Sequence, residues 1–488
     1  MNAYERHRFA MAAATVAALV FGCFVFGALS VRTFKGLALI GLMFCLVVYW
    51  IKPQLMVWVA LLLAFAPVPE NWHMAMVIGP VTIYAFHVTL ILAIGYLIPI
   101  VRPRFSDYLL PGMFGLTVVF FAAAGLANGH PTDVTLREAM FLLEMVGGFM
   151  LALLIVGSDY VKGSMHALAV TLWFSAGMVA LSSLQGIKLA GRRESLQLAT
   201  GATEAVRLVT NAGIPAMAVL AVLIAAQIFG RVRPALALAL APPALIIVLL
   251  GFSRNTFICL AVTAVVAFVA NLGWSPVRQT AVFTVISAMV FTVAVPGALF
   301  LLQHSVAGAW LGDQFSAFNH RVLQGISTSA LSVDASTLDR LNEDRHLNNS
   351  IAQAPMFGHG LGYAYQPPFG DDPNGFTETW GTTYSHNFYL WWLCKAGAAG
   401  MAMFALFALM PIVRGLRCAS VPAKIGAAVS IGLLAVCVVA PLPEGPPDAM
   451  ALGMALGAAM GFVKQQRQRQ SVDRVDAQPT PALVGASA

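Results

Sequence analysis

A histidine follows a long polar interruption in an otherwise apolar chain. His386 comes directly after the stretch His304–Ser385, which contains no apolar run of membrane-spanning length, and directly before Asn387 and an aromatic run. A neutral imidazole can accept a proton near neutral pH, which few other side chains can do. His386 is therefore the candidate general base. The alternative is a buried histidine whose ring is satisfied by a backbone carbonyl.

Three arginines are candidates for binding an anionic group. Arg254 stands between two apolar runs, Arg207 leads into an apolar run, and Arg340 lies on a predicted helix of the polar stretch. A guanidinium group stays charged and can bind phosphate through two parallel hydrogen bonds. The alternatives are an arginine reaching toward lipid headgroups for Arg254, an ordinary loop cation for Arg207, and a solvated helix face paired with Asp344 for Arg340.

Membrane-spanning helices must position these residues. Hydrophobic residues make up 59% of the 488 residues and charged residues only 10%, which is too few charges to cover the surface of a soluble fold. We therefore predict an all-α polytopic bundle. The apolar runs indicate about 14 spans, with approximate limits 9–31, 36–51, 54–68, 82–101, 107–127, 138–158, 165–184, 212–229, 234–251, 255–272, 279–303, 386–413, 424–441 and 449–463.

The distribution of Lys and Arg among the loops predicts the orientation of the chain. Both termini are expected in the cytoplasm, which leaves two long loops, 185–211 and 304–385, on the other side. The chain then divides into a bundle of eleven spans over 1–303, a periplasmic loop over 304–385, C-terminal spans over 386–463 and a disordered cytoplasmic tail over 464–488. The net charge of +7 is scattered over short loops, so we expect no nucleic-acid partner.

The large loop is expected to contain one amphipathic helix. Ser336 and Asp339 fit a capping pattern at its start, and Pro355 ends it. We predict a helix of about 18 residues lying across the membrane face, with the apolar stripe Leu338, Leu341, Leu347 and Ile351. A Gly-rich stretch over 358–381 follows, in which His359 occupies a tight backbone turn between two glycines.

Several common signatures of catalytic and cofactor sites are missing from the sequence. It has no HExxH motif, no Walker loop and no acidic cluster that asks for Mg²⁺ or Mn²⁺. We therefore expect a reaction without a bound metal or nucleotide cofactor.

Two segments of the chain together resemble the O-antigen ligase and O-antigen polymerase superfamily. They are PMFGHGLG over 355–362 and SHNFYLWWLCKAG over 385–397, which are similar to the superfamily's PxxGxGxG turn and following HN-x-x-L…G pattern. Ser253-Arg254 resembles the superfamily's "SR" at a helix mouth, and Arg340 stands at the usual distance before the turn. Arg207 with Asn211 resembles an upstream Arg…Asn motif but lacks the usual Asn-Pro-Asn ending. The likeness covers about residues 200–410.

The resemblance implies a glycosyltransferase of the bacterial inner membrane that acts at the periplasmic face on glycans linked to undecaprenyl diphosphate. In this chain it implies that Arg254, Arg340 and Arg207 hold the diphosphate and that His386 deprotonates the acceptor hydroxyl, without metal or nucleotide. Candidates for supporting roles are Asn387, His359, Tyr384, Arg345 and Arg321.

Three functions stay open at this point. The first is a polymerase that joins lipid-linked repeat units into exopolysaccharide or O-antigen, favoured because many spans and a large loop leave room for two long glycans. The second is a ligase that transfers the glycan to lipid A-core or to protein. The third is a lipid-linked-sugar flippase or other transporter, which would bury charges at mid-membrane. Expected partners are the lipid-linked glycan, the acceptor glycan or lipid A-core, membrane lipid, and a chain-length regulator and flippase of the same pathway.

Overall fold

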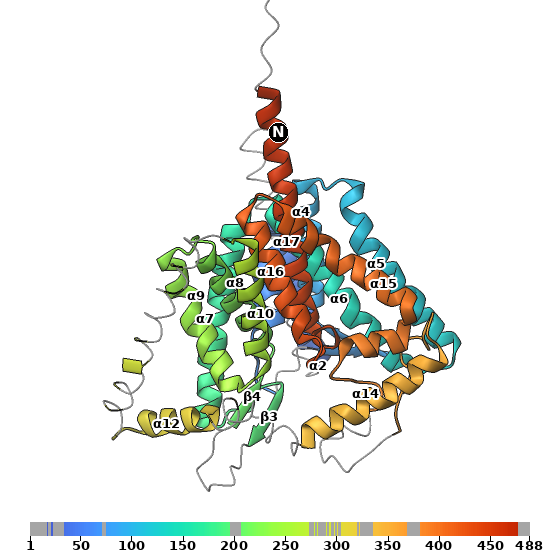
Figure 1. Cartoon of the computed structure of the whole chain (residues 1–488), viewed down its shortest axis with the longest axis horizontal. Coiled ribbons are helices and arrows are strands. Elements are labelled where there is room, and N and C mark those ends of the chain that lie inside the picture. The colour runs from blue at the N-terminus through green and yellow to red at the C-terminus, as the bar shows by residue number, and fades with distance from the viewer. Residues whose placement is uncertain are drawn as a thin grey trace, which may run out of the picture.

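The protein is a bundle of packed helices, with two small β-hairpins (Figure 1). The computed structural model describes residues 34–70, 75–195, 206–272, 304–319, 335–367 and 381–476, together with isolated residues between these ranges. The helices are α2 (Phe34–Ile51), α3 (Leu55–Phe65), α4 (Ala85–Val101), α5 (Phe105–Ala127), α6 (Thr132–Gly157), α7 (Val161–Gln185), α8 (Gly213–Ile228), α9 (Pro234–Gly251), α10 (Asn255–Ala270), α12 (Val306–Phe318), α14 (Ala335–Gln353), α15 (Phe388–Arg417), α16 (Val421–Val436), the 3₁₀ turn η4 (Leu442–Glu444) and α17 (Pro446–Asp476).

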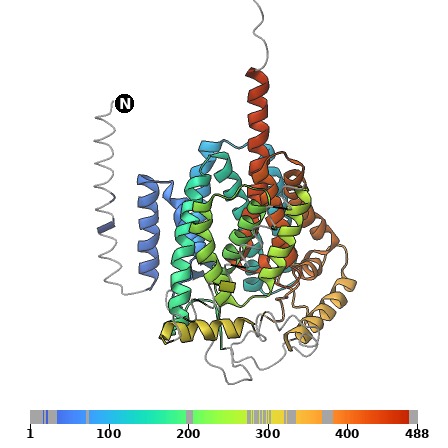
Figure 2. The ribbon, with the colours of Figure 1, turned by 60° about the vertical axis from the view of Figure 1, so that its left-hand side comes forward.

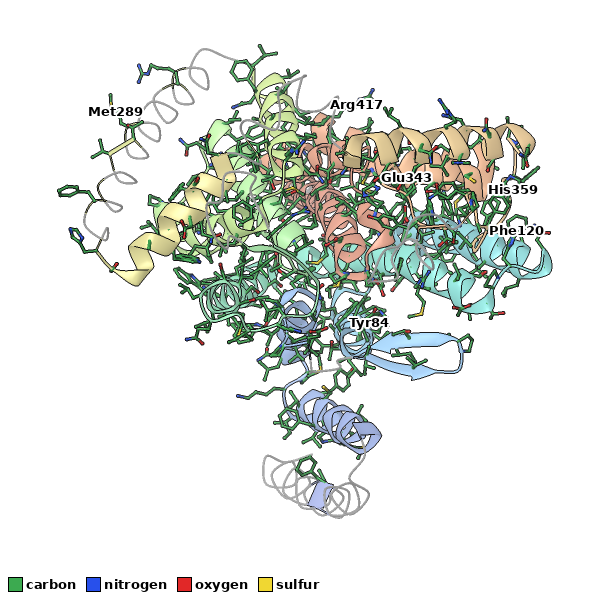
Figure 3. The ribbon with its side chains drawn as sticks, turned by 90° about the horizontal axis from the view of Figure 1, so that it is seen from below. Tyr84, Phe120, Met289, Glu343, His359 and Arg417 are labelled. Atoms are coloured by element: carbon green, nitrogen blue, oxygen red, sulfur yellow. The ribbon has the colours of Figure 1, made fainter. Side chains whose placement is uncertain are left out.

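Helix length and composition identify a multi-pass membrane protein. Within the described ranges, five helices are long and apolar enough to cross a bilayer, namely α5, α6, α7, α9 and α15, and the shorter apolar helices α3, α4, α8, α10 and α16 accompany them. Apolar side chains such as Leu116, Val119 and Phe120 of α5 are largely exposed, and Phe120 lies at the edge of the bundle (Figure 3). Lipid would cover such a surface, whereas water would not be a favourable neighbour for it.

The predicted spans agree with the helices wherever the structure describes the chain. A helix lies at every predicted span except 9–31 and 279–303, which fall outside the described ranges. The limits differ most at α17, which ends at Asp476 instead of residue 463, at α6, which begins at Thr132 instead of residue 138, and at α16, which ends at Val436 instead of residue 441.

The tail is a correction to the sequence prediction. Residues 464–476, predicted to be disordered, continue α17 to Asp476. Two contacts hold the start of this extension to the bundle: Lys464 Nζ lies 2.5 Å from Asp107 Oδ1, and Gln465 Nε2 donates to Asp159 Oδ1 at 2.7 Å. Gln, Lys and Arg are also good helix formers, so a polar composition alone does not end a helix that is already nucleated.

Helix α6 forms the centre of the bundle, and α17 packs along it. Glycine permits the close approach: a Cβ atom at Gly453 would lie 2.0 Å from the carbonyl oxygen of Met145. Beside this contact the rings of Phe114 and Phe407 stack with centroids 4.7 Å apart, and Phe149 adjoins Phe407. This tightly packed centre supports the helices that carry the polar residues described below.

Two short hairpins accompany the helices. Strands β1 (Ala75–Ile78) and β2 (Val81–Tyr84) pair antiparallel with Ala75 opposite Tyr84, and β3 (Arg192–Ser195) and β4 (Val206–Val209) pair with Arg192 opposite Val209. These strands were not predicted, because four residues are too few to show a clear alternation of apolar and polar side chains.

One end of the bundle carries most of the non-spanning structure. Strands β3 and β4 and helices α12 and α14 lie at the lower end in Figure 1, and the C-terminal part of α17 projects from the opposite end. Figure 2 shows the same arrangement after rotation, with α12 and α14 lying across the lower end. We call this the α14 end.

Candidate functional site

Helix α15 is broken one-third of the way along its length. Gly397 has φ 61° and ψ −167°, which is not a helical conformation. The amides of Ala398 and Ala399, which lose their helical partners at the break, donate to the carbonyls of Pro355 and Met356 at 2.9 and 3.0 Å. The turn after α14 therefore replaces hydrogen bonds that the helix lacks.

The same turn also satisfies the other side of the break. The amides of His359 and Gly360 donate to the carbonyls of Cys394 and Lys395 at 3.0 and 2.8 Å. Gly358 has φ +63°, and a Cβ atom there would lie 2.4 Å from the carbonyl carbon of Lys395. The Gly-rich turn that carries the superfamily resemblance is thus inserted into the broken helix.

A buried ion pair fixes the end of this turn. Lys395 is fully buried, and its Nζ contacts Glu138 Oε1 at 2.9 Å and the carbonyl oxygen of Tyr363 at 2.5 Å. The second carboxylate oxygen of Glu138 accepts the amide of Gly362 at 2.6 Å. A buried charge pair is tolerated when further hydrogen bonds satisfy it, as they do here. The ion pair thereby joins α6, α15 and the turn that follows α14, close to the start of α15.

His386 lies at that start and binds a carboxylate on α14. Its Nδ1 is 3.1 and 3.0 Å from Oε1 and Oε2 of Glu343, and its backbone amide donates to Oε2 at 3.1 Å. Glu343 is only 5% exposed. Figure 3 shows Glu343 on α14 toward the middle of the bundle. Two hydrogen bonds from one residue to one carboxylate fix both the position and the ring orientation of His386.

The contact with Glu343 also selects the tautomer of His386. A carboxylate accepts, so Nδ1 carries the hydrogen and Nε2 carries the lone pair. No hydrogen-bond partner of Nε2 is present among the described residues, and the side chain is 25% exposed. Nε2 is therefore the ring nitrogen whose lone pair the described residues leave unused.

A second histidine–glutamate pair provides an internal comparison. His87 Nε2 binds Glu144 Oε1, and His87 Nδ1 accepts the amide of Tyr84 at 3.2 Å. Both ring nitrogens of His87 are occupied and the residue is buried, so it has no free position for a substrate proton. A nearby carboxylate alone does not make a base, and the free Nε2 distinguishes His386.

Helix α14 forms as predicted, but only part of its predicted apolar stripe faces inward. It spans Ala335–Gln353, close to the predicted helix, and ends before Pro355. Leu341, predicted in the apolar stripe, is 62% exposed, whereas Glu343, Leu347 and Ser350 are buried. These three have the i, i+4, i+7 spacing of one helix face. Glu343 was not predicted as a site residue. Its position one helical turn before Leu347, on the same face, is the sequence signal that could have revealed it.

Arg340 lies one turn before Glu343 on the same helix. Its Nε atom is buried and has no hydrogen-bond partner in the described structure. The expected pairing with Asp344 is not among the ion pairs of the described residues; the Asp344 carboxylate is hydrogen-bonded by the side chain of Asn387. A buried, unpaired guanidinium nitrogen costs stability and is satisfied most readily by an anion.

Arg207 and Arg254 both lie at the turn between α9 and α10. Arg207, on β4, donates from Nε to the carbonyl oxygen of Gly251 at 3.2 Å. Arg254 occupies the N-cap position of α10, three residues later. The arrangement brings the hairpin β3–β4, predicted as plain loop, against the helix mouth.

Helix α16 connects this turn to the start of α15. Gly432 of α16 packs on Cys259 of α10, and five residues later the carbonyl of Cys437 accepts the amide of Phe388 at 3.0 Å. Cys259 is likewise five residues after Arg254, which is about 7.5 Å along a helix. Because the two helices run in opposite directions across this contact, Arg254 and His386 lie at one level, on the same α14 end.

The supporting candidates have separate positions. Asn387 caps α15, its Oδ1 accepting the amide of Leu390 at 3.3 Å, and the ring of Tyr384 meets that of His386 edge-on at 5.4 Å. His359 lies in the tight turn that was expected, with Nε2 2.9 Å from the carbonyl of Ser350, and is farther from the bundle centre than Glu343 (Figure 3). Arg345 is exposed on α14. Arg321 lies outside the described residues.

Burial also changes the acidity of neighbours of His386. Burial raises the pKa of Asp344, and the adjacent charge of Glu343 raises it further. Burial, followed by the negative charges of Glu444 and Glu343, raises the pKa of the Tyr384 hydroxyl.

Comparison with known proteins gives one family. Residues 234–405 match the family described as O-antigen ligase, a range that includes Arg254, Arg340, Glu343 and His386 but not Arg207. A search of curated proteins gives no match to the chain. Members of the matching family are ligases and polymerases that transfer lipid-linked glycans. Residues 234–405 are therefore similar to the O-antigen ligase family domain.

Proposed function

We propose that this protein is an inner-membrane glycosyltransferase that polymerises undecaprenyl-diphosphate-linked repeat units at the periplasmic face, with His386 as the general base. The observation that carries the proposal is the contact between His386 Nδ1 and the buried carboxylate of Glu343, which leaves Nε2 free. The family match over residues 234–405 supplies the class of reaction.

The chemistry follows from this geometry. Nε2 of His386 takes the proton of an acceptor sugar hydroxyl as its oxygen attacks the anomeric carbon of the donor. The bond from that carbon to the diphosphate oxygen breaks, and undecaprenyl diphosphate leaves with the bonding electrons. The anomeric configuration inverts. The Glu343 carboxylate stabilises the imidazolium formed in this step, and the acid–base contribution is worth about 10²- to 10⁴-fold in rate.

The leaving diphosphate is assigned to the arginines. Arg254 and Arg340 hold it and Arg207 assists, because negative charge accumulates on the diphosphate as the anomeric bond breaks. The unpaired Nε of Arg340 supports this role. Each charge-assisted hydrogen bond contributes about 1.5–3 kcal/mol. The proposal uses no metal ion and no nucleotide.

The first test asks whether the contact between His386 and Glu343 serves catalysis or only the structure. Glu343→Gln keeps the shape of the side chain but turns an amide N–H₂ group toward Nδ1, which favours the tautomer with hydrogen on Nε2. That tautomer cannot accept the hydroxyl proton, so turnover should fall well below wild type. His386→Ala should lose about 10²- to 10⁴-fold, measured as polymer formed from lipid-linked glycan.

The matched control is Asp339→Asn, which removes a charge from an exposed position of the same helix. It should retain wild-type turnover. Wild-type turnover in both Glu343→Gln and His386→Ala, in protein that inserts and folds normally, would contradict the proposed base.

The glycans that accumulate in a deletion strain identify the acceptor. Polymerase and ligase use the same chemistry on the donor and differ in what receives the glycan. Single repeat units capped on their acceptor indicate a polymerase, whereas full-length glycan retained on undecaprenyl diphosphate indicates a ligase. Lipid-linked units accumulating on the cytoplasmic face would contradict both and indicate a flippase.

A further inference from the structure

Helix α12 is attached to the α14 end by an inward-facing stripe. At its start Trp310 Nε1 donates to Ser183 Oγ of α7 at 2.9 Å. The same ring packs on the cluster that contains Leu208 and Leu250, the neighbours of Arg207 and Gly251. This end of α12 therefore lies over the Arg207 side of the helix mouth.

The other end of α12 lies over the Arg254 side. The ring of Phe318 is 6.4 Å from that of Phe252 and 6.2 Å from that of Phe257, the two aromatic residues that flank Arg254 in the sequence. Ala317 is fully buried in the same contact with Phe252. The helix thus spans the turn that holds both arginines, beside α9 and α10 (Figure 1).

Gln314 lies between these two anchors. Trp310, Gln314, Ala317 and Phe318 have the i, i+4, i+7, i+8 spacing of one helix face. Gln314 is 8% exposed, and its Oε1 atom has no hydrogen-bond partner in the described part of the chain. An apolar residue at this position would pack without penalty, whereas a buried amide without a partner lowers the stability of the fold.

We infer that Gln314 recognises a sugar of the lipid-linked donor, beside the arginines that hold the diphosphate. The inference rests on the proposed function and extends it from the diphosphate to the glycan. The unpaired atom is a carbonyl oxygen, which accepts hydrogen bonds. A diphosphate oxygen also only accepts, so it cannot satisfy Oε1.

The ligand of Oε1 must therefore carry a donor. The group next to the diphosphate in such a lipid is the first sugar, whose hydroxyls donate. Helix α12 thus supplies specificity for the glycan, and Arg254 and Arg207 supply binding of the charge common to every donor.

The experiment uses the full-length protein in detergent and two probes. One is undecaprenyl diphosphate without sugar, and the other is the undecaprenyl-diphosphate-linked glycan extracted from membranes of the source strain. Gln314→Leu should bind the sugar-free lipid as wild type does and bind the glycan-linked lipid about tenfold more weakly. Its KM for the glycan-linked donor should rise while kcat is unchanged.

Stability separates recognition from a structural role. Gln314→Leu should have a Tm at or above that of wild type, because the change removes an unsatisfied buried amide. Gln353→Leu, the same change at an exposed position of α14, is the control for the substitution itself and should bind both lipids normally. A lowered Tm with equal loss of both lipids would mean that Gln314 is structural and would overturn the inference.

The outcomes also separate the two proposals. If the wild-type protein binds neither lipid, the proposed function fails. If it binds both and Gln314→Leu keeps the full wild-type preference for the glycan-linked lipid, only the role of Gln314 fails.

Discussion

At the scale of single residues, the partners of a histidine decide what it can do. His87 and His386 each contact a buried glutamate, yet the two rings differ at the second nitrogen. In His87 that nitrogen accepts a backbone amide, whereas in His386 it has no partner in the described structure. The sequence gives no sign of this difference, because Glu343 and Glu144 are 43 and 57 residues from their histidines.

Arg254 provides a test at the same scale. Arg254→Lys keeps the positive charge but replaces a planar group of five donors by a point charge, which cannot form two parallel hydrogen bonds to phosphate. We expect a loss of turnover of about tenfold or more, equivalent to one charge-assisted hydrogen bond. Polymer formation by the purified variant measures it. Full activity would leave Arg254 only the role of reaching toward lipid headgroups.

At the scale of elements, the broken helix α15 and the turn after α14 form one unit. Each supplies the hydrogen bonds that the other lacks, and the pair Lys395–Glu138 holds both against α6. Since α14 carries Glu343 and α15 begins at His386, this unit fixes the separation of the two. The Gly-rich motif therefore fixes the relative positions of the two helices that meet at His386 and Glu343.

A glycine substitution tests that unit. Gly358→Ala adds a Cβ atom 2.4 Å from the carbonyl carbon of Lys395 at a residue with φ +63°. Both effects are unfavourable, so we expect a markedly lower Tm and loss of activity together. Gly177→Ala in α7, where nothing lies within 4 Å, is the control and should behave as wild type. Equal Tm values for the two variants would contradict the insertion of the turn into α15.

Glu444, in the 3₁₀ turn η4, is expected to make the stability of the protein depend on pH. Glu444 is buried and accepts the amide of Ser385 at 3.4 Å. Burial raises its pKa well above the usual value, and the charge of Glu138 raises it further. The native state therefore binds this proton more tightly than the unfolded state, so wild-type stability falls as the pH rises above about 4.3, the pKa of an unfolded glutamate, until it reaches the native pKa.

Glu444→Gln resembles the protonated side chain and should remove that loss. The Tm of the variant minus that of wild type should therefore increase as the pH is raised from about 4.5, as followed by thermal unfolding in a pH series. Asp339→Asn at an exposed position serves as the control and should show no such trend. A constant difference for Glu444→Gln would contradict the raised pKa.

At the scale of the whole molecule, the residues of the proposed site lie at the α14 end. The arginines at the α9–α10 turn, the His386–Glu343 pair and Gln314 come from elements that α12, α14 and α16 bring to one level. The proposed reaction at one membrane face needs its residues at one level of the bundle.

The orientation of the bundle can be tested directly. In a variant without native cysteines, Asn348→Cys places a thiol at an exposed position of α14 and Gln468→Cys at an exposed position of α17. A membrane-impermeant maleimide added to intact cells should label the first and not the second, because the α14 end is assigned to the periplasm. Labelling of the second alone would reverse the orientation and exclude a periplasmic site.

The sequence by itself determined the membrane class, most helix positions and the candidates His386, Arg254, Arg207 and Arg340. These depend on hydropathy and on residue type, which are properties of short segments. Only the tertiary structure decided which residues meet: Glu343 with His386, the turn at Gly358 with the break at Gly397, and Gln314 with the arginine-bearing turn. Such contacts join residues far apart in the chain, and local periodicity carries no information about them. Helix α14 illustrates this limit of the sequence most clearly. The face that turns inward carries Glu343, the partner of His386, and Leu341 is left exposed.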